Sequence, residues 1–162
     1  MRKQIDSIFV YLFFIACWIF FFYFYPYHLH YKEQITLCVL QPDFLQMYLQ
    51  KPAFLTEICG DYLTQFFLWT GGGSNILTLT FVFIWLGLRI ALRKTGITSH
   101  VSLWALLPIV AEWALSCHLE YPLSMSLGLM CSVWAFLLST LSTSTRTRGI
   151  LHVVMLIILY CA

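Results

Sequence analysis

Residues 8–25 read IFVYLFFIACWIFFFYFY, an uninterrupted apolar run that Pro26 closes. A helix needs about 20 such residues to cross roughly 30 Å of hydrocarbon. Arg2 and Lys3 precede the run, as they would in a secretory signal peptide, but signal peptides end in small residues at a cleavage site. The bulky rings at the end of this run are typical of an interfacial aromatic belt instead. The run therefore predicts an uncleaved membrane span.

The composition of the whole chain favours the same class of protein. Of its 162 residues, 60% are hydrophobic and only 10% are charged, whereas an ordinary soluble domain carries about 25% charged residues. A soluble domain of this size leaves much of its surface wet and could not hide so many apolar side chains. The formal net charge is only +2, which argues against a nucleic-acid partner. The expected partner is the lipid bilayer.

Further apolar segments follow at about residues 75–92, 101–118, 123–141 and 150–162. The last is too short to cross a bilayer as a helix, so we expect this chain to be the N-terminal part of a longer protein. The sequence predicts an all-α polytopic membrane protein, with residues 1–162 forming a single transmembrane domain. It would have four spans and a truncated fifth, and the glycines at 71–73 would be a flexible break before the second span.

The basic residues alternate in a way that sets the direction of the spans. With the N-terminus inside, two basic residues fall in outer segments and seven in inner ones, namely Arg2, Lys3, Arg89, Arg93, Lys94, Arg146 and Arg148. This distribution obeys the positive-inside rule on every loop. We therefore expect a cytoplasmic N-terminus in the cell inner (cytoplasmic) membrane. The outer segments also receive five of the seven acidic residues.

The long outer loop, residues 27–70, should contain helices, because a structureless loop of that length is unusual. Pro42 and Pro52 each suit the first turn of a helix. After Pro52, apolar side chains recur at helical spacing, and Glu57, Asp61 and Gln65 share the opposite face. Such helices can lie in the membrane interface, or they can pack against the spans.

Five acidic residues are candidate catalytic groups: Glu33, Asp43, Glu57, Asp61 and Glu112. Paired carboxylates beside a membrane can bind a cation or act as acid and base. The alternative for Glu57 and Asp61 is the wet face of an amphipathic helix. Glu112 lies inside the third span, where a carboxylate is costly. It is either functional, or protonated, or hydrogen-bonded to a neighbouring helix, and we expect no basic residue at its depth.

Metal and cofactor signals are weak. On a strand, His28 and His30 would point the same way, and Glu33 could complete a metal site. The alternative is a pair of interfacial histidines among tyrosines. Cys38 and Cys59 could form a disulfide in an oxidising compartment. No cofactor-binding motif is present, because no Gly-Lys-Ser/Thr follows the glycines at 71–73, and the sequence names no cofactor.

Three stretches resemble the start of a family of large multi-spanning membrane proteins from Bacteroidetes. They are His28-Leu29-His30-Tyr31 with Glu33-Gln34, then Gln41-Pro42-Asp43-Phe44, then Gly60-Asp61-Tyr62-Leu63-Thr64-Gln65-Phe66-Phe67. The resemblance covers about residues 1–95. It implies that a full-length relative continues with more spans. The family has no assigned activity, so the resemblance implies no catalytic residues.

The sequence leaves three kinds of function open. The first is an envelope enzyme acting on lipid-linked substrates, with one of the loop carboxylates as base or metal ligand; this rests on architecture alone. The second is a non-catalytic scaffold or assembly subunit, in which Ser124, Gly128 and Ser132 form a seam for other membrane proteins. The third is a transporter with Glu112 on its path, against which stand the few polar residues and the expected absence of a broken helix.

Overall fold

The computed structural model describes residues 2–36, 42–97, 99–140, 149–150, 153–155 and 160. Within these ranges the regular elements are all helical, which confirms the all-α class. In chain order they are α1 (Arg2–Ile19), the π-helix η1 (Phe20–Phe24), α2 (Pro26–Ile35), α3 (Pro42–Leu49), α4 (Phe54–Thr64), the 3₁₀-helix η2 (Gln65–Leu68), α5 (Gly72–Lys94), α6 (Val101–Trp104), α7 (Leu107–Ser116) and α8 (Leu123–Ser139).

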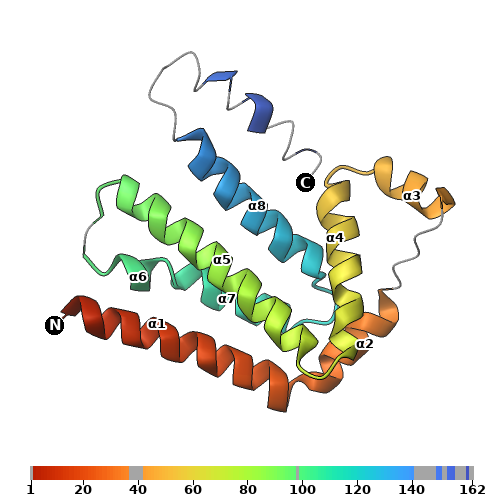
Figure 1. Ribbon diagram of the computed structural model, residues 1–162, viewed down its shortest axis with the longest axis horizontal. Coiled ribbons are helices and arrows are strands. Elements are labelled where there is room, and N and C mark those ends of the chain that lie inside the picture. Colours follow the sequence, from red (N-terminus) through yellow and green to blue (C-terminus); the bar gives the residue numbers. More distant parts are fainter. Residues whose placement is uncertain are drawn as a thin grey trace.

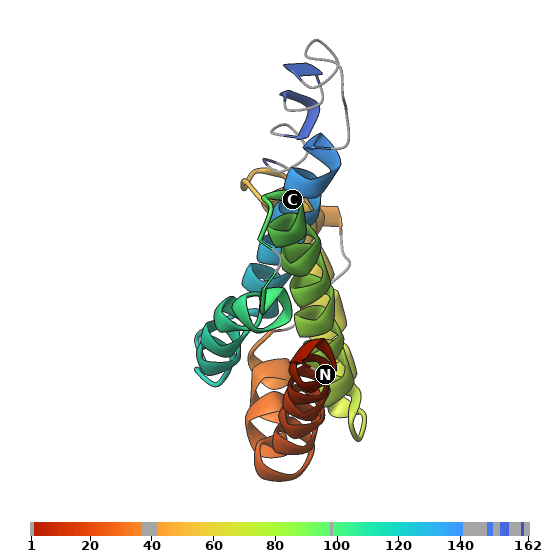
Figure 2. The same cartoon turned by 90° about the vertical axis from the view of Figure 1, so that its left-hand side faces the viewer.

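Helix α5 is the centre of the arrangement. It packs between α1 and α8, and α6 and α7 also contact it (Figure 1). Turning the molecule shows α6 and α7 standing out to one side of the layer that α1, α5 and α8 form (Figure 2). Helices α2 and α4 gather at the end where α1 finishes and α5 begins, while the N-terminus and α6 lie at the opposite end. The molecule therefore has two distinct ends.

Proline marks the start of several helices, as the sequence predicts. Helix α3 begins at Pro42, and α4 begins two residues after Pro52. Pro26 occupies the first position of α2, where its missing N–H has no intrahelical partner to lose. The stretch that contains His28 and His30 is therefore helical, and its interpretation as a strand is wrong.

The glycines at 71–73 are not a flexible break. Gly71 has a φ of +80°, and α5 already begins at Gly72. A Cβ on Gly72 would lie 2.0 Å from the carbonyl oxygen of Phe66, and one on Gly73 would lie 2.8 Å from Cδ1 of Leu29. Glycine is needed here because it allows neighbouring backbone and side chains to approach closely.

The third apolar segment is broken, contrary to the expectation from sequence. Helix α6 ends at Trp104, and α7 starts at Leu107 with Pro108 in its first turn. Proline cannot donate the hydrogen bond that would continue the earlier helix. Two apolar helical stretches, Asp6–Phe24 and Gly72–Lys94, are long enough to cross a membrane by length and composition, whereas Val101–Ser116 and Leu123–Ser139 are shorter. The predicted fifth segment lies mostly outside the described residues.

Several polar side chains are buried, while many large apolar ones face outward. Among the described residues, ten polar or charged ones are buried: Lys32, Thr56, Thr64, Ser74, Thr80, Ser102, Glu112, Ser116, Ser126 and Ser139. On α4 the inward face consists of small residues, including Gly60, whereas Leu55 and Tyr62 are 45% and 49% exposed. This helix therefore packs through its small residues, and part of its apolar face points outward. The apolar core lies along the middle of α1, α5 and α7 and includes Phe21, Phe81, Ile84 and Ile109.

Two helical glycines allow a matched test of this packing. A Cβ on Gly60 would lie 2.8–2.9 Å from the backbone N and Cα of Ser124, so Gly60→Ala should force α4 and α8 apart. Overpacking of this kind costs about 1–3 kcal/mol. Gly128 on α8 has nothing within 4 Å of the same position, so Gly128→Ala should stabilise the helix by about 0.5–1 kcal/mol. The melting temperature in detergent should fall for Gly60→Ala and rise for Gly128→Ala, relative to the wild type. Equal shifts in the two variants would contradict the close contact between α4 and α8.

Candidate functional site

A cavity of about 230 Å³ lies between α2, α4, the start of α8 and the α7–α8 connection. We call it the Lys32 cavity. Its polar lining includes Lys32, Asp61, Ser116, Glu120, Tyr121 and Ser126. Apolar side chains, among them Phe67, Leu77 and Leu123, form the rest of the wall. A concave site with a few convergent polar groups is the arrangement expected of a small-molecule site.

Lys32 organises one wall of the cavity. Its side chain is buried, and Nζ donates hydrogen bonds to the carbonyl oxygens of Ser116 at 2.8 Å and Tyr121 at 3.1 Å. The Tyr25 hydroxyl donates to the carbonyl of the intervening Cys117. These carbonyls lie at and just beyond the carboxyl end of α7, where the helix dipole favours a cation. Lys32 therefore caps α7 and fixes the chain that leads to α8.

Burial also changes the chemistry of Lys32. It lowers the pKa of the Lys32 amine from 10.5 to about 8. An amine that titrates near neutral pH can both give and accept a proton. The neutral amine retains two N–H groups, which suffice for the two carbonyls.

Glu112 does not line the cavity itself, but it accepts hydrogen bonds from two residues that do. It is 4% exposed, and its Oε1 accepts hydrogen bonds from the Tyr121 hydroxyl at 2.9 Å and from Ser126 Oγ at 2.5 Å. Burial, and then the hydrogen bond to Glu112, raise the pKa of Tyr121 to about 12, so the phenol remains a donor. Of the alternatives for Glu112, the hydrogen bond to a neighbouring helix is thus present. No ion pair between Glu112 and a basic residue is present in the described part of the chain; Lys32 bonds instead to the carbonyl of Ser116, one turn along α7.

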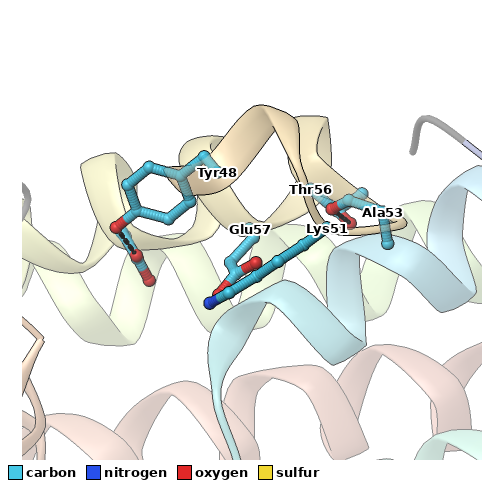
Figure 3. Close-up of polar contacts among 6 residues, drawn as sticks. Tyr48, Lys51, Ala53, Thr56 and Glu57 are labelled. Carbon is cyan, nitrogen blue, oxygen red and sulfur yellow. Dashed lines mark hydrogen bonds and ion pairs between the residues drawn. The ribbon is translucent and has the colours of Figure 1, made fainter. Parts of the chain in front are cut away.

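Asp61 and Glu57, one turn apart on α4, have different surroundings. Asp61 lines the Lys32 cavity and accepts a hydrogen bond from the Tyr48 hydroxyl at 2.5 Å. Burial is the main cause that raises the pKa of the Asp61 carboxyl. Glu57 does not line this cavity; it pairs with exposed Lys51 at 2.9 Å, as Figure 3 shows. Asp61 alone of the two lines the Lys32 cavity, but both carboxylates line the neighbouring groove between α4 and α8, and the charge of Glu57 contributes to the raised pKa of Asp61.

Two acidic candidates from the long loop remain, Glu33 and Asp43. Glu33 is half-buried on α2 and does not line the cavity. Asp43 lies in the first turn of α3, and its side chain falls outside the part of the chain that the structure describes. Glu120 lines the cavity, but its neighbour His118 does not. Among the acidic side chains that the structure describes, only Asp61 and Glu120 contribute to the lining.

The predicted metal site is not formed. His28, His30 and Glu33 lie on a helix, where residues two apart point to different sides. Among the described residues, no three His, Cys, Asp or Glu side chains come close enough to hold a metal ion. His28 stacks on the ring of Tyr25 with centroids 4.2 Å apart, which fits the interfacial alternative. Cys59 is a free thiol, and its predicted disulfide partner Cys38 lies outside the described residues.

Sequence reasoning missed the hydrogen-bonding centre of the site. Lys32, Tyr121 and Ser126 were not candidates, since a lysine in an outer loop, a tyrosine and a serine are common residue types. One signal was available. Lys32 is one of only two basic residues in segments expected outside.

The depressed pKa of Lys32 predicts a pH dependence of stability. Because the folded value of about 8 lies below the unfolded 10.5, the unfolded chain binds more protons between these pH values. The stability of the wild type should therefore rise from about pH 8 to 10.5 relative to Lys32→Met, measured as melting temperature in detergent. Lys51→Met removes an exposed lysine and should follow the wild-type profile. A wild-type advantage that falls over this range would contradict the burial of Lys32.

Comparisons with known proteins give the family but no activity. The model of a family of unknown function, DUF6057, matches residues 2–162. The match extends well beyond the first 95 residues or so that carried the resemblance in the sequence, and it confirms an uncharacterised family. No curated protein and no solved structure is detectably similar to this chain. The chain thus belongs, over nearly its whole length, to the DUF6057 family of unknown function.

Proposed function

We propose that this protein is a multi-pass membrane protein with a cytoplasmic N-terminus, whose Lys32 cavity binds the hydroxyl-rich headgroup of a lipid-linked envelope substrate. The observation that carries the proposal is a cavity lined by a buried lysine, carboxylates and hydroxyls, at one end of helices whose outward faces are apolar. Three features support it: the apolar exterior, the direction of the helices and the chemistry of the cavity.

The distribution of polar and apolar side chains supports a location in a membrane. Water would favour the reverse arrangement, with apolar groups inside and Ser, Thr and Glu outside. Small residues at helix contacts, such as Gly60 against Ser124 and Gly87 against Val133, are typical of helices that associate in lipid. The apolar stretches of α1 with η1 and of α5 are long enough to cross a membrane. Helix α8, with 17 residues, is at the lower bound for a span, and α6 with α7 would form a broken one.

The charged residues at the two ends of the molecule support the proposed orientation, with a cytoplasmic N-terminus. Arg89, Arg93 and Lys94 lie at the end of α5 that neighbours the N-terminus. Lys32, Asp61 and Glu120 lie at the other end, around the Lys32 cavity. The positive-inside rule then favours a cavity on the outer side. Envelope substrates carried on lipid would reach it with their tails beside the apolar helix faces.

The composition of the cavity favours a hydroxyl-rich ligand over an anion. One cation, Lys32, faces two carboxylates, Asp61 and Glu120, so a phosphate would meet net repulsion. Carboxylates accept hydrogen bonds from sugar hydroxyls, and the lysine amine donates to sugar oxygens. The volume of about 230 Å³ suits a single headgroup. In an enzyme, Asp61 would act as the base, and Lys32, with its pKa of about 8, as the acid.

The apolar core argues against a transport path. Between the Lys32 cavity and the arginines at the far end of α5 lie Phe81 and Ile84, both fully buried. Ile109 on α7 is also fully buried. In the described part of the chain, these buried apolar side chains lie between the two ends, which argues against a transport path.

A scaffold is the second candidate, and one observation favours it. A groove lined by Thr56, Ser124, Gly128 and Ser132 runs between α4 and α8. Nothing lies within 4 Å of the position that a Cβ on Gly128 would take. The seam predicted from sequence therefore has room for a partner helix beyond its contact with Gly60.

The ligand proposal is testable with the purified chain in nanodiscs. The probes are polyprenyl-phosphate-linked mono- and disaccharides, with the sugar-free polyprenyl phosphate as reference, and the readout is native mass spectrometry. Asp61→Asn and Lys32→Met should each weaken binding of the sugar-bearing lipids about tenfold or more, since each removes a charged hydrogen-bonding group. Binding of the sugar-free lipid should be weak throughout.

Glu57→Gln is the matched control. Glu57 lies one turn from Asp61, does not line the Lys32 cavity and pairs with exposed Lys51, so this variant should bind like the wild type. Asp61→Asn keeps the side-chain shape, which keeps the test valid if Lys32→Met fails to fold. Equal binding by the wild type and Asp61→Asn, or no preference for sugar-bearing lipid, would exclude the proposed ligand and leave the scaffold.

A further inference from the structure

A second polar cavity lies at the opposite end of the molecule from the Lys32 cavity. Its volume is about 310 Å³, and its lining includes Asp6, Ser7, Arg89, Arg93, His100 and Ser102. It forms where α1 begins, α5 ends and α6 starts. We call it the Arg89 cavity. None of its residues was a candidate site residue in the sequence, and none contributes to the function proposed above.

The two arginines share one face of α5. They are four residues apart, so their side chains lie on the same side of the helix and both line the cavity. Neither forms an ion pair with a carboxylate in the described part of the chain, where the salt bridges are Lys51–Glu57 and His100–Asp6. Two guanidinium groups thus face one cavity without a fixed counter-charge.

Arg89 is held in place by a contact that leaves one of its donors free. Its guanidinium carbon lies 5.0 Å from the centroid of the Trp85 ring, and the Trp85 indole N–H is itself fixed by the carbonyl of Ser102 at 3.0 Å. The Nε of Arg89 is buried without a hydrogen-bond partner in the described part of the chain. A buried guanidinium N–H with no partner is costly, and the other N–H groups of this guanidinium can donate to an oxyanion in the cavity.

The one carboxylate that lines the cavity among the described residues is already engaged. Asp6 contacts Nδ1 of His100 at 3.0 Å. His100 adopts a φ of +51°, in the left-handed region that residues other than glycine rarely occupy. Since Asp6 is paired with His100, the cavity keeps a net positive charge from the two arginines.

We propose that the Arg89 cavity binds a phosphate ester through Arg89 and Arg93. The planar fork of arginine matches phosphate oxygens and can donate two parallel hydrogen bonds. Two sources offer this chemistry at this end of the helices: the headgroup of an anionic phospholipid and a free phosphate ester. The proposal stands on the contacts of this cavity and does not depend on the ligand of the Lys32 cavity.

The test uses the full chain purified in detergent and native mass spectrometry. The probes are dioleoyl phosphatidylglycerol, uncharged dioleoylglycerol as reference, and glycerol 3-phosphate. Arg93→Gln is the main variant, because Arg93 is exposed and its loss should leave the fold intact. We expect it to weaken binding of the phosphate-bearing probe about tenfold or more. Arg89→Lys, which keeps the charge but loses the planar fork, should also weaken binding.

Lys94→Gln is the matched control. It removes the same charge from the next residue, but Lys94 points elsewhere and contacts Thr140 Oγ1 at 3.1 Å. It should bind within about twofold of the wild type, since only diffuse electrostatics change. Binding of the phospholipid that glycerol 3-phosphate does not displace would identify a lipid headgroup, and displacement would identify a site for free phosphate esters. Equal losses in Arg93→Gln and Lys94→Gln, or binding of neither phosphate-bearing probe, would overturn the proposal.

Discussion

The hydrogen bonds from buried Lys32 to the carbonyls of Ser116 and Tyr121 are the interaction on which the rest of the candidate site depends. They join α2, which follows the first long helix, to the chain between α7 and α8. That chain carries Tyr121, whose hydroxyl reaches Glu112. The same connection leads into α8 and Ser126, the second donor to Glu112. Without the lysine, the carbonyls at the end of α7 and just beyond it would lose their donor in an interior with little water to replace it.

The apolar exterior explains why so few interactions involve charge. Hydroxyls of Thr64, Thr80 and Ser139 donate to carbonyls of their own helices, which satisfies them without a partner helix. Glycines at 60, 73 and 87 let side chains or backbone of neighbouring helices approach closely. Many polar groups gather at the two ends, in the Lys32 cavity and the Arg89 cavity, whereas the indoles of Trp18 and Trp134 donate to Asn75 and to the Phe83 carbonyl outside both cavities. The function of this chain is therefore to be sought at its ends.

Local signals in the sequence predicted much of the fold. The apolar run at 8–25 and the prolines at 42 and 52 predicted helices close to those observed, because proline is compatible with the start of a helix. Pro26 was expected only to close the first run, and the helix α2 that it begins was not predicted. The broken third segment was missed because Pro108 is compatible with either a kink or a new helix. The packing face of α4 was left open, because helical spacing of apolar residues does not say whether they point inward or outward.

The site was harder to predict than the fold, since it depends on contacts between distant segments. Lys32 and Ser116 are 84 residues apart, and no spacing rule connects them. Asp61 was a candidate from sequence and does line the cavity, but its assumed partner Glu57 pairs with Lys51 instead. Helical spacing of four residues does place both side chains on one side of α4, where they line the groove against α8, but Asp61 alone of the two also reaches the Lys32 cavity.

Labelling of single cysteines in oriented membrane vesicles tests the central claim most directly, that the Lys32 cavity opens on the outer side of a membrane. One variant keeps exposed Cys59 on α4 as its only cysteine; the other has Ser99→Cys, an exposed position near the Arg89 cavity, as its only cysteine. A membrane-impermeant maleimide should label Cys59 in right-side-out vesicles and Ser99→Cys only in inside-out vesicles. Labelling of both positions from the same side, or the reverse pattern, would contradict the account.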